Sequence, residues 1–275
     1  MERKKGRIMD TKLRSAYILS IIIAILALVA AAGGLPIGNL YRDSSAFIME
    51  GWFGNDLVTL LVALPVLVGA LILSMRGSYR AQPVWLGMLD YMLYNYAFYV
   101  FGAAFNRFFL IYATLFTLSI FALIFGLANI DVDQIGRKFQ AKTPVKWISG
   151  YMMLWAILLG TAWIAQTLIF AVTGQLPPSG LGEGGIKLAV ALDLSFVVSG
   201  LVLATIWLLK RRPWGYVLSV IFNVKGAAYA LVLTAGSLSQ TAAGLKGAMD
   251  LVPLWAFLGL ASLASSVLLL RNMRS

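Results

Sequence analysis

The sequence predicts an all-α protein that crosses a membrane eight times. Of its 275 residues, 60% are hydrophobic and only 12% are charged, whereas about a quarter of the residues of a soluble domain are charged. Apolar runs long enough to span a hydrocarbon layer of about 30 Å recur along the chain. We therefore expect a polytopic membrane protein in which residues 1–275 form a single transmembrane domain.

Polar connectors separate the eight expected helices. The helices are expected at residues 15–34, 56–75, 83–105, 107–129, 147–173, 187–209, 214–236 and 249–270. Residues 35–55 and 174–186 hold much of the Gly, Pro and acid of the chain, so we expect them to be loops on one side of the membrane. Residues 130–146 are polar and basic and are expected to connect two helices on the other side.

Lysine and arginine are unequally divided between the two predicted sides. With the N-terminus in the cytoplasm, 17 of the 22 Lys and Arg residues are cytoplasmic, four are outside, and Lys225 is in the membrane. Positive residues favour the cytoplasmic side, so both termini are predicted to be cytoplasmic, and we expect the plasma membrane. Attraction to the lipid bilayer then explains the net charge of +11 without nucleic-acid binding.

The two halves of the sequence share a pattern. Asp56 and Asp193 each begin an expected helix that ends in basic residues, and the helix after each begins near a proline. We therefore expect two four-helix repeats, residues 15–129 and 147–270, which would run parallel because each has an even number of helices. The alternative is that any two helical hairpins would share this pattern.

Several segments resemble a family of uncharacterised multi-pass bacterial membrane proteins. These segments are GNDLVTL at 54–60, YNYAFYVFG at 94–102 and RRPWGY at 211–216. The family has Gln where this chain has Asn55, and the resemblance covers most of residues 40–235. It implies an integral membrane protein with this order of helices, and it implies no activity.

The composition excludes several kinds of chemistry. The chain has no Cys and no His, so it has no disulfide, thiolate nucleophile, imidazole metal site or histidine general base. We accordingly predict no catalytic residue, no metal and no cofactor, and we do not expect an enzyme.

Three ionisable residues fall inside the apolar runs, namely Asp90, Asp193 and Lys225. A charge inside the membrane is costly and indicates a functional site with a partner. The hairpin connection favours Asp193 as the partner of Lys225, whereas the tilt of side chains toward the helix N-terminus favours Asp90. Both pairings are open, and so is the alternative that Lys225 forms a structural ion pair.

The third expected helix is unusually polar, with four tyrosines, Asp90 and Asn95 between residues 90 and 99. Hydroxyl groups in the middle of a membrane helix need a partner or water, which indicates either an aromatic cavity for a ligand or hydrogen bonds between helices. Asp56 either caps its helix or forms, with Glu50, Asp193 and Asp250, an acidic outer vestibule for cations. The candidate ligand-binding residues are Asp56, Asp90, Tyr94, Asn95, Asp193, Asn223 and Lys225.

These observations lead to two functional hypotheses. The first is a small-solute or ion transporter, or a ligand-binding membrane protein, with a polar site between the third, sixth and seventh helices. Lys225 would be its switchable charge, because burial readily changes the protonation of lysine. The alternative is a non-catalytic accessory or structural subunit of a larger membrane complex.

Overall fold

The computed structural model describes residues 11–35, 40–176 and 181–274. It is 82% helical and has no strand in these ranges, apart from one isolated antiparallel bridge between Phe139 and Met273. The all-α prediction is therefore confirmed.

Eleven α-helices follow one another along the described chain. They are α1 (Arg14–Gly34), α2 (Ala46–Val58), α3 (Leu64–Met75), α4 (Ala81–Phe101), α5 (Phe109–Asn129), α6 (Val132–Lys138), α7 (Val145–Thr173), α8 (Gly182–Leu192), α9 (Ser199–Leu209), α10 (Pro213–Ala242) and α11 (Val252–Arg271). Two π-helical segments, η2 (Thr59–Ala63) and η3 (Asp193–Val198), join α2 to α3 and α8 to α9. Each joined set is one continuous helix.

Seven helices of the described chain are long and apolar enough to cross a membrane, so this is a multi-pass membrane protein. They are α1, α2–α3, α5, α7, α8–α9, α10 and α11. Helix α4 is as long as α1, with 21 residues, but it is not among the seven. Sixteen of its residues are buried, and a helix enclosed by protein does not need apolar side chains against lipid.

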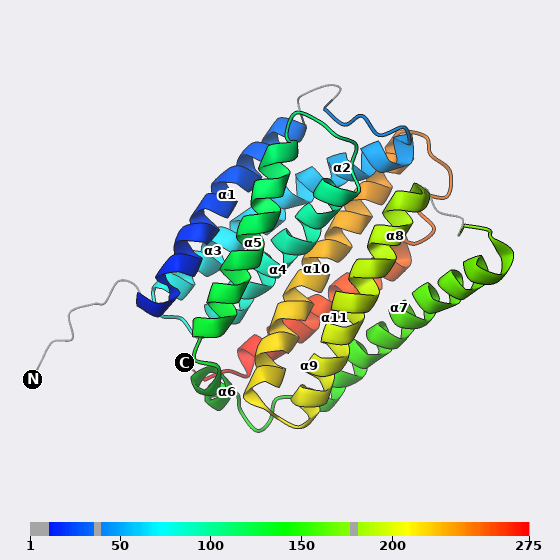
Figure 1. The fold of residues 1–275 in the computed structure, drawn as a ribbon. Coiled ribbons are helices and arrows are strands. Elements are labelled where there is room, and N and C mark those ends of the chain that lie inside the picture. Colours follow the sequence, from blue (N-terminus) through cyan, green and yellow to red (C-terminus); the bar gives the residue numbers. More distant parts are fainter. Residues whose placement is uncertain (1–10, 36–39, 177–180, 275) are drawn as a thin grey trace, which may run out of the picture.

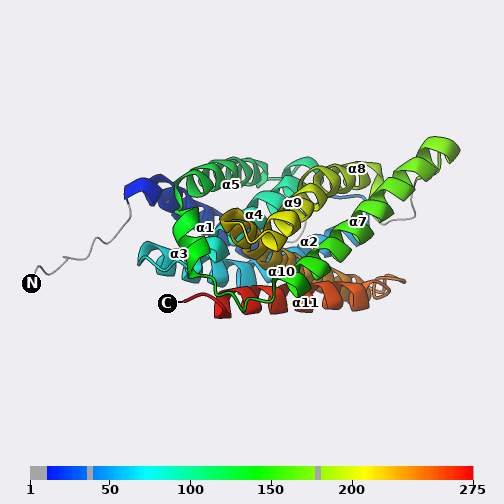
Figure 2. The same cartoon turned by 90° about the horizontal axis from the view of Figure 1, so that it is seen from below.

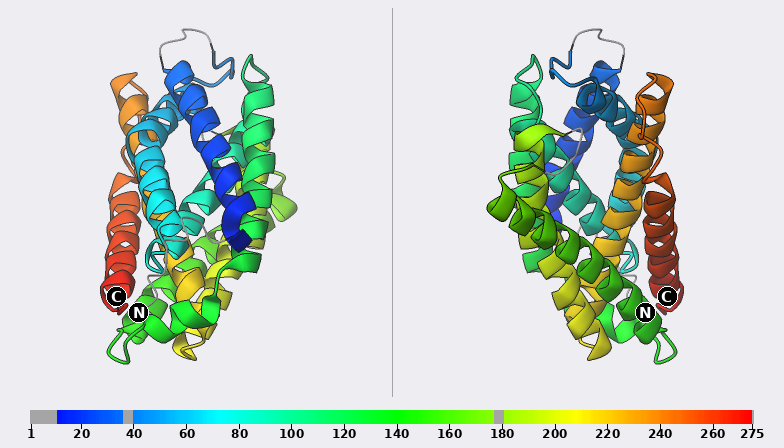
Figure 3. Two further views of the ribbon diagram at one scale, coloured as in Figure 1. Left: turned by 90° about the vertical axis from the view of Figure 1, so that its left-hand side faces the viewer. Right: turned by 90° about the vertical axis from the view of Figure 1, so that its right-hand side faces the viewer.

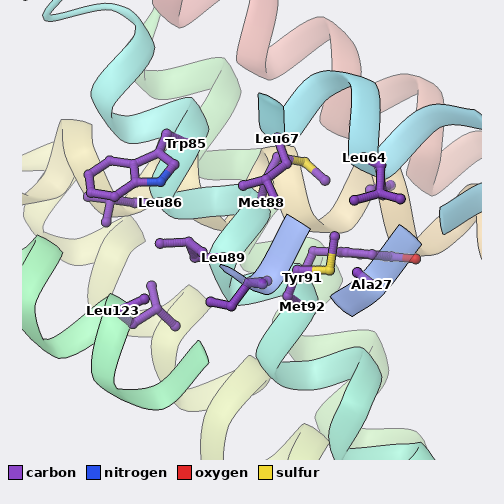
Figure 4. Close-up of a cluster of buried hydrophobic side chains, with 14 of the residues drawn as sticks. Ala27, Leu64, Leu67, Trp85, Leu86, Met88, Leu89, Tyr91, Met92 and Leu123 are labelled. Atoms are coloured by element: carbon purple, nitrogen blue, oxygen red, sulfur yellow. The ribbon is translucent and has the colours of Figure 1, made fainter. Parts of the chain in front are cut away.

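Helices α4 and α10 form the centre of the bundle. Helix α4 packs against α3, α5 and α10, and α10 packs against α2, α9 and α11 as well (Figure 1). Helix α7 contacts α9 and diverges from the rest of the bundle at its other end (Figure 2). The core around α4 includes Trp85, Leu86, Met88 and Leu89 from α4, Ala27 from α1, Leu64 and Leu67 from α3, and Leu123 from α5 (Figure 4).

Two expected external loops are partly helical, which corrects the predicted boundaries. Helix α2 begins at Ala46 instead of residue 56, and α8 begins at Gly182 instead of residue 187. Packing against α10 explains the early start of α2, since a Cβ on Gly54 would lie 2.3 Å from the backbone nitrogen of Gly236. Glycine there allows two backbones to touch, so the glycine content that suggested a loop instead permits helix packing.

The basic connectors and the C-terminal segment meet at one end of the bundle. The backbone nitrogen of Arg274 donates to the carbonyl of Lys138 at 2.8 Å, and that of Gln140 donates to Asn272 at 2.9 Å. The guanidinium of Arg80 donates to the carbonyl of Met273. The first turn of α1 lies at this same end (Figures 1 and 3), so the described chain begins and ends on one side.

Candidate functional site

Lys225 of α10 and Asp90 of α4 form a buried ion pair at the centre of the bundle. The Lys225 Nζ atom lies 3.8 Å from Asp90 Oδ2, and the two side chains are 5% and 2% exposed. Gly87 brings the two helices together, because a Cβ at this position would lie 2.9 Å from the Cβ of Val224. The pairing is the one that side-chain tilt favours, not the one that the hairpin connection favours.

Aromatic rings surround the Lys225 ammonium. Its Nζ atom lies 3.9 Å from the centroid of the Tyr94 ring, 4.7 Å from that of Phe196 and 6.0 Å from that of Phe222. Ring faces attract cations, most strongly where water is absent. The 3.8 Å separation is longer than a hydrogen bond, and no other protein atom in the described structure bonds Nζ or the Asp90 carboxylate oxygens. Within the protein the ammonium is therefore held by the charge of Asp90 and by ring faces.

Tyr94 connects this ion pair to a second buried carboxylate. Its hydroxyl donates to Asp193 Oδ1 at 2.5 Å, and the indole nitrogen of Trp163 on α7 donates to Asp193 Oδ2 at 2.8 Å. Asp193 also interacts electrostatically with Lys225. We refer to Asp90, Tyr94, Asp193 and Lys225 as the Lys225 cluster.

Asp193 is the first residue of the π segment η3. Segments of π-helix are rare inside α-helices and are frequent at functional sites. The other such segment, η2, ends two residues before Pro65, whose missing N–H interrupts the α-helical hydrogen bonds. No proline accounts for η3, since none lies between Gly182 and Leu209.

A pocket of about 340 Å³ adjoins the Lys225 cluster between α4, α5 and the helix that contains η3. Its lining is apolar or aromatic except for one serine, and consists of Leu93, Tyr94, Ala97, Phe116, Ile120, Leu192, Ser195 and Phe196. Lys225 is not part of this lining. Tyr94 and Phe196 both line the pocket and contact the ammonium, so these two rings form the wall between them.

Asp56, another candidate, lies in a different polar network. It is ten residues beyond the start of α2, so it does not cap the helix. It accepts hydrogen bonds from the hydroxyls of Tyr41 and Tyr99, the latter at 2.8 Å. Burial raises the pKa of Tyr41 well above its ordinary value, so this hydroxyl keeps the proton that it donates.

Asn95 lies in a third set of hydrogen bonds, separate from the Lys225 cluster. Its Oδ1 accepts from Asn55 Nδ2 at 2.7 Å, and the hydroxyls of Thr59 and Tyr91 lie 2.8 Å apart beside it. These contacts hold α4 against the helix that contains η2. They correspond to the alternative in which polar residues of the third helix bind neighbouring helices.

Asn223 does not join the Lys225 cluster either. Its amide donates to the carbonyl of Ser219 on the same helix at 2.7 Å. Helix positions two apart lie on different faces, so Asn223 and Lys225 point in different directions. Four of the seven candidates, Asp90, Tyr94, Asp193 and Lys225, are therefore brought together by the fold.

Sequence reasoning did not identify Trp163, Phe196 or Phe222. Trp163 has a usable signal, because a tryptophan far from the helix ends is outside the interfacial belts and its indole N–H needs an acceptor. The two phenylalanines have no such signal, since either would suit a lipid-facing position.

No group of three or more Asp or Glu residues in the described chain is placed to hold a metal ion. Comparisons with protein-family models, with curated proteins and with solved structures found no match. The function is therefore argued from the geometry of the site.

Proposed function

We propose that this chain is a small-solute transporter of the plasma membrane whose binding site is the Lys225 cluster. The observation that carries the proposal is the buried pair of Lys225 and Asp90, whose polar atoms have no hydrogen-bond partner. A pair that served only to fix packing needs good geometry and further hydrogen bonds to offset the loss of water. This pair lacks those bonds, and a pocket lies behind two of the rings that hold it.

The proposal includes eight membrane crossings, with α4 as the eighth. Its 21 residues correspond to about 30 Å at a rise of 1.5 Å per residue. Because the basic connectors lie at the end where the described chain begins and finishes (Figure 1), the positive-inside rule favours cytoplasmic termini.

Two parallel repeats, residues 15–129 and 147–270, are also part of the proposal. In each half the second long helix contains a π segment. In each half that helix also carries a buried aspartate, Asp56 or Asp193, that accepts two hydrogen bonds from aromatic side chains. The central helices α4 and α10 occupy equivalent places in the two halves and pack together, so the Lys225 cluster lies between the repeats.

The test is solute uptake by proteoliposomes, measured with and without a proton gradient, after a thermal-shift screen of the purified protein against a broad library of small solutes. We expect at least one compound to raise the melting temperature and to be taken up. The Asp193→Asn variant should lose both effects, whereas Asp56→Asn, which changes a buried carboxylate outside the cluster, should retain them. No shift and no uptake for the native protein would overturn the proposal.

A second candidate function is an accessory subunit of a membrane complex. It is favoured by the separation of Lys225 from the pocket and by the apolar residues that α7 exposes, such as Ile157, Leu168 and Val172. This function predicts that the cluster binds no solute and that α7 is protected from lipid. Crosslinking from α7 to a defined protein, together with a negative solute screen, would support it over transport.

A further inference from the structure

We infer that the ligand of the Lys225 cluster is a lipophilic organic cation that enters sideways from the bilayer through the pocket lined by Tyr94 and Phe196. This inference rests on the proposed function and specifies its substrate class. Three features of the described structure carry it, namely the charge of the cluster, its aromatic walls and the position of the pocket.

The cluster contains two acidic side chains and one basic side chain. Asp90 and Asp193 are two buried carboxylates, and Lys225 is the only buried Lys or Arg in the described ranges. With all three ionised the cluster has one excess negative charge, and buried charges are stable only when they are paired. A monovalent cation would complete the balance, whereas an anion would double the excess.

The aromatic walls of the pocket also favour a positively charged ligand. Lys225 already shows that the ring faces of Tyr94 and Phe196 accept an ammonium, at 3.9 and 4.7 Å from their centroids. The same two rings line the pocket on its wall toward the cluster. A second ammonium in the pocket would contact these two rings, one of which belongs to the tyrosine that is hydrogen-bonded to Asp193. Aromatic walls of this kind bind alkylated ammonium groups in other proteins.

The position of the pocket indicates entry from the lipid. It lies between α4, α5 and the helix that contains η3, and α5 and the η3 helix are two of the candidate membrane spans. Ser195, which lines it, is exposed, and Phe116 and Ile120 of α5 are partly exposed. Its volume of about 340 Å³ is in the range of small-ligand pockets. An apolar lining that opens between membrane helices suits the hydrocarbon part of an amphiphile.

The test compares two probes that differ in the sign of their charge, octyltrimethylammonium and octyl sulfate. Binding to the full chain in nanodiscs is measured by equilibrium dialysis, with empty nanodiscs as the background. We expect saturable binding of octyltrimethylammonium and none of octyl sulfate. The Asp193→Asn variant should weaken binding at least tenfold.

A second variant tests the pocket without changing any charge. Ala97→Trp fills the pocket and should also weaken binding at least tenfold, whereas Leu110→Trp, at a position of α5 that is 78% exposed, should have no effect. If Asp193→Asn does not fold, the comparison of these two variants decides the question.

Two results would overturn the inference. Octyl sulfate could bind as well as the ammonium probe, or Ala97→Trp could leave binding of the ammonium probe unchanged. If neither probe binds while another solute in the library does, the substrate class is wrong and the proposed transport function stands. If no compound of any class binds, the proposed function itself fails.

Discussion

Replacing Lys225 by methionine would leave Asp90 buried without its counter-charge. At a separation of 3.8 Å, and with an effective dielectric constant near 20, the attraction of the pair is about 4 kcal/mol. Breaking a buried pair by removing one partner typically costs about 3–5 kcal/mol. We therefore expect the free energy of unfolding of Lys225→Met to fall by about 3–5 kcal/mol.

Removing both charges should recover this loss. Well-packed apolar replacements of buried ion pairs are often neutral or stabilising, by about 1–4 kcal/mol. The double variant Asp90→Leu/Lys225→Met should thus recover most of the loss, because the Asp90 charge is gone and Asp193 keeps its hydrogen bonds from Tyr94 and Trp163. Neither carboxylate oxygen of Asp90 has another hydrogen bond to lose.

Unfolding by sodium dodecyl sulfate in mixed micelles, followed by circular dichroism, measures these free energies. A Lys225→Met variant as stable as the native chain would refute the reasoning, because the two side chains would then not depend on each other. A double variant as unstable as the single one would also refute it, since the loss would come from packing and not from an unpaired charge.

Further predictions concern packing, the second polar network and topology. Gly54→Ala should destabilise the protein by about 1–3 kcal/mol, since its Cβ would lie 2.3 Å from the Gly236 nitrogen. The control Gly69→Ala, with no atom within 4 Å, should change stability by less than about 1 kcal/mol in thermal melts. Tyr99→Phe removes the 2.8 Å hydrogen bond to Asp56. It should cost about 1.5–3 kcal/mol in the same unfolding assay, with ligand-induced thermal shifts unchanged. Because the chain has no cysteine, single cysteines introduced as Lys142→Cys and Lys246→Cys can report the membrane topology. An impermeant thiol reagent added from outside should label only Lys246→Cys. Labelling of both variants, or of Lys142→Cys alone, would contradict the predicted orientation.

The sequence was sufficient to predict the all-α class. The tilt of side chains favoured Asp90 as the partner of Lys225 and the hairpin connection favoured Asp193, and the described structure has the pair with Asp90. The tilt argument applies to this pair because both residues lie on long regular helices, where the direction of a side chain follows from its position.

Other contacts depend on how distant segments pack, which the sequence does not reveal. Asp56 is bound by Tyr41, which precedes α2 in a connector whose path follows no periodic pattern. Asp193 is bound by Trp163 only because α7 packs against η3. The π segments also change the register of the helices that contain them, so a regular helical wheel would misplace residues beyond Thr59 and Asp193.

The low hydropathy of α4 also results from packing between segments that are distant in the sequence. Its polar residues are tolerated because neighbouring helices enclose it, and they supply partners such as Asn55 for Asn95 and Asp193 for Tyr94. Expected loops were helical for a related reason, since contacts with α10 stabilise the first turns of α2. The amino-acid composition of a segment does not reveal such contacts between helices.

The most direct test of the central claim is a thermal-shift screen of the native chain and the Asp193→Asn variant against the same library of small solutes. Asp56→Asn, which changes a buried carboxylate outside the Lys225 cluster, is the control for loss of stability. We predict that compounds that raise the melting temperature of the native chain also raise that of Asp56→Asn and leave that of Asp193→Asn unchanged. Equal shifts in the native chain and in Asp193→Asn would contradict the claim that the Lys225 cluster is the binding site.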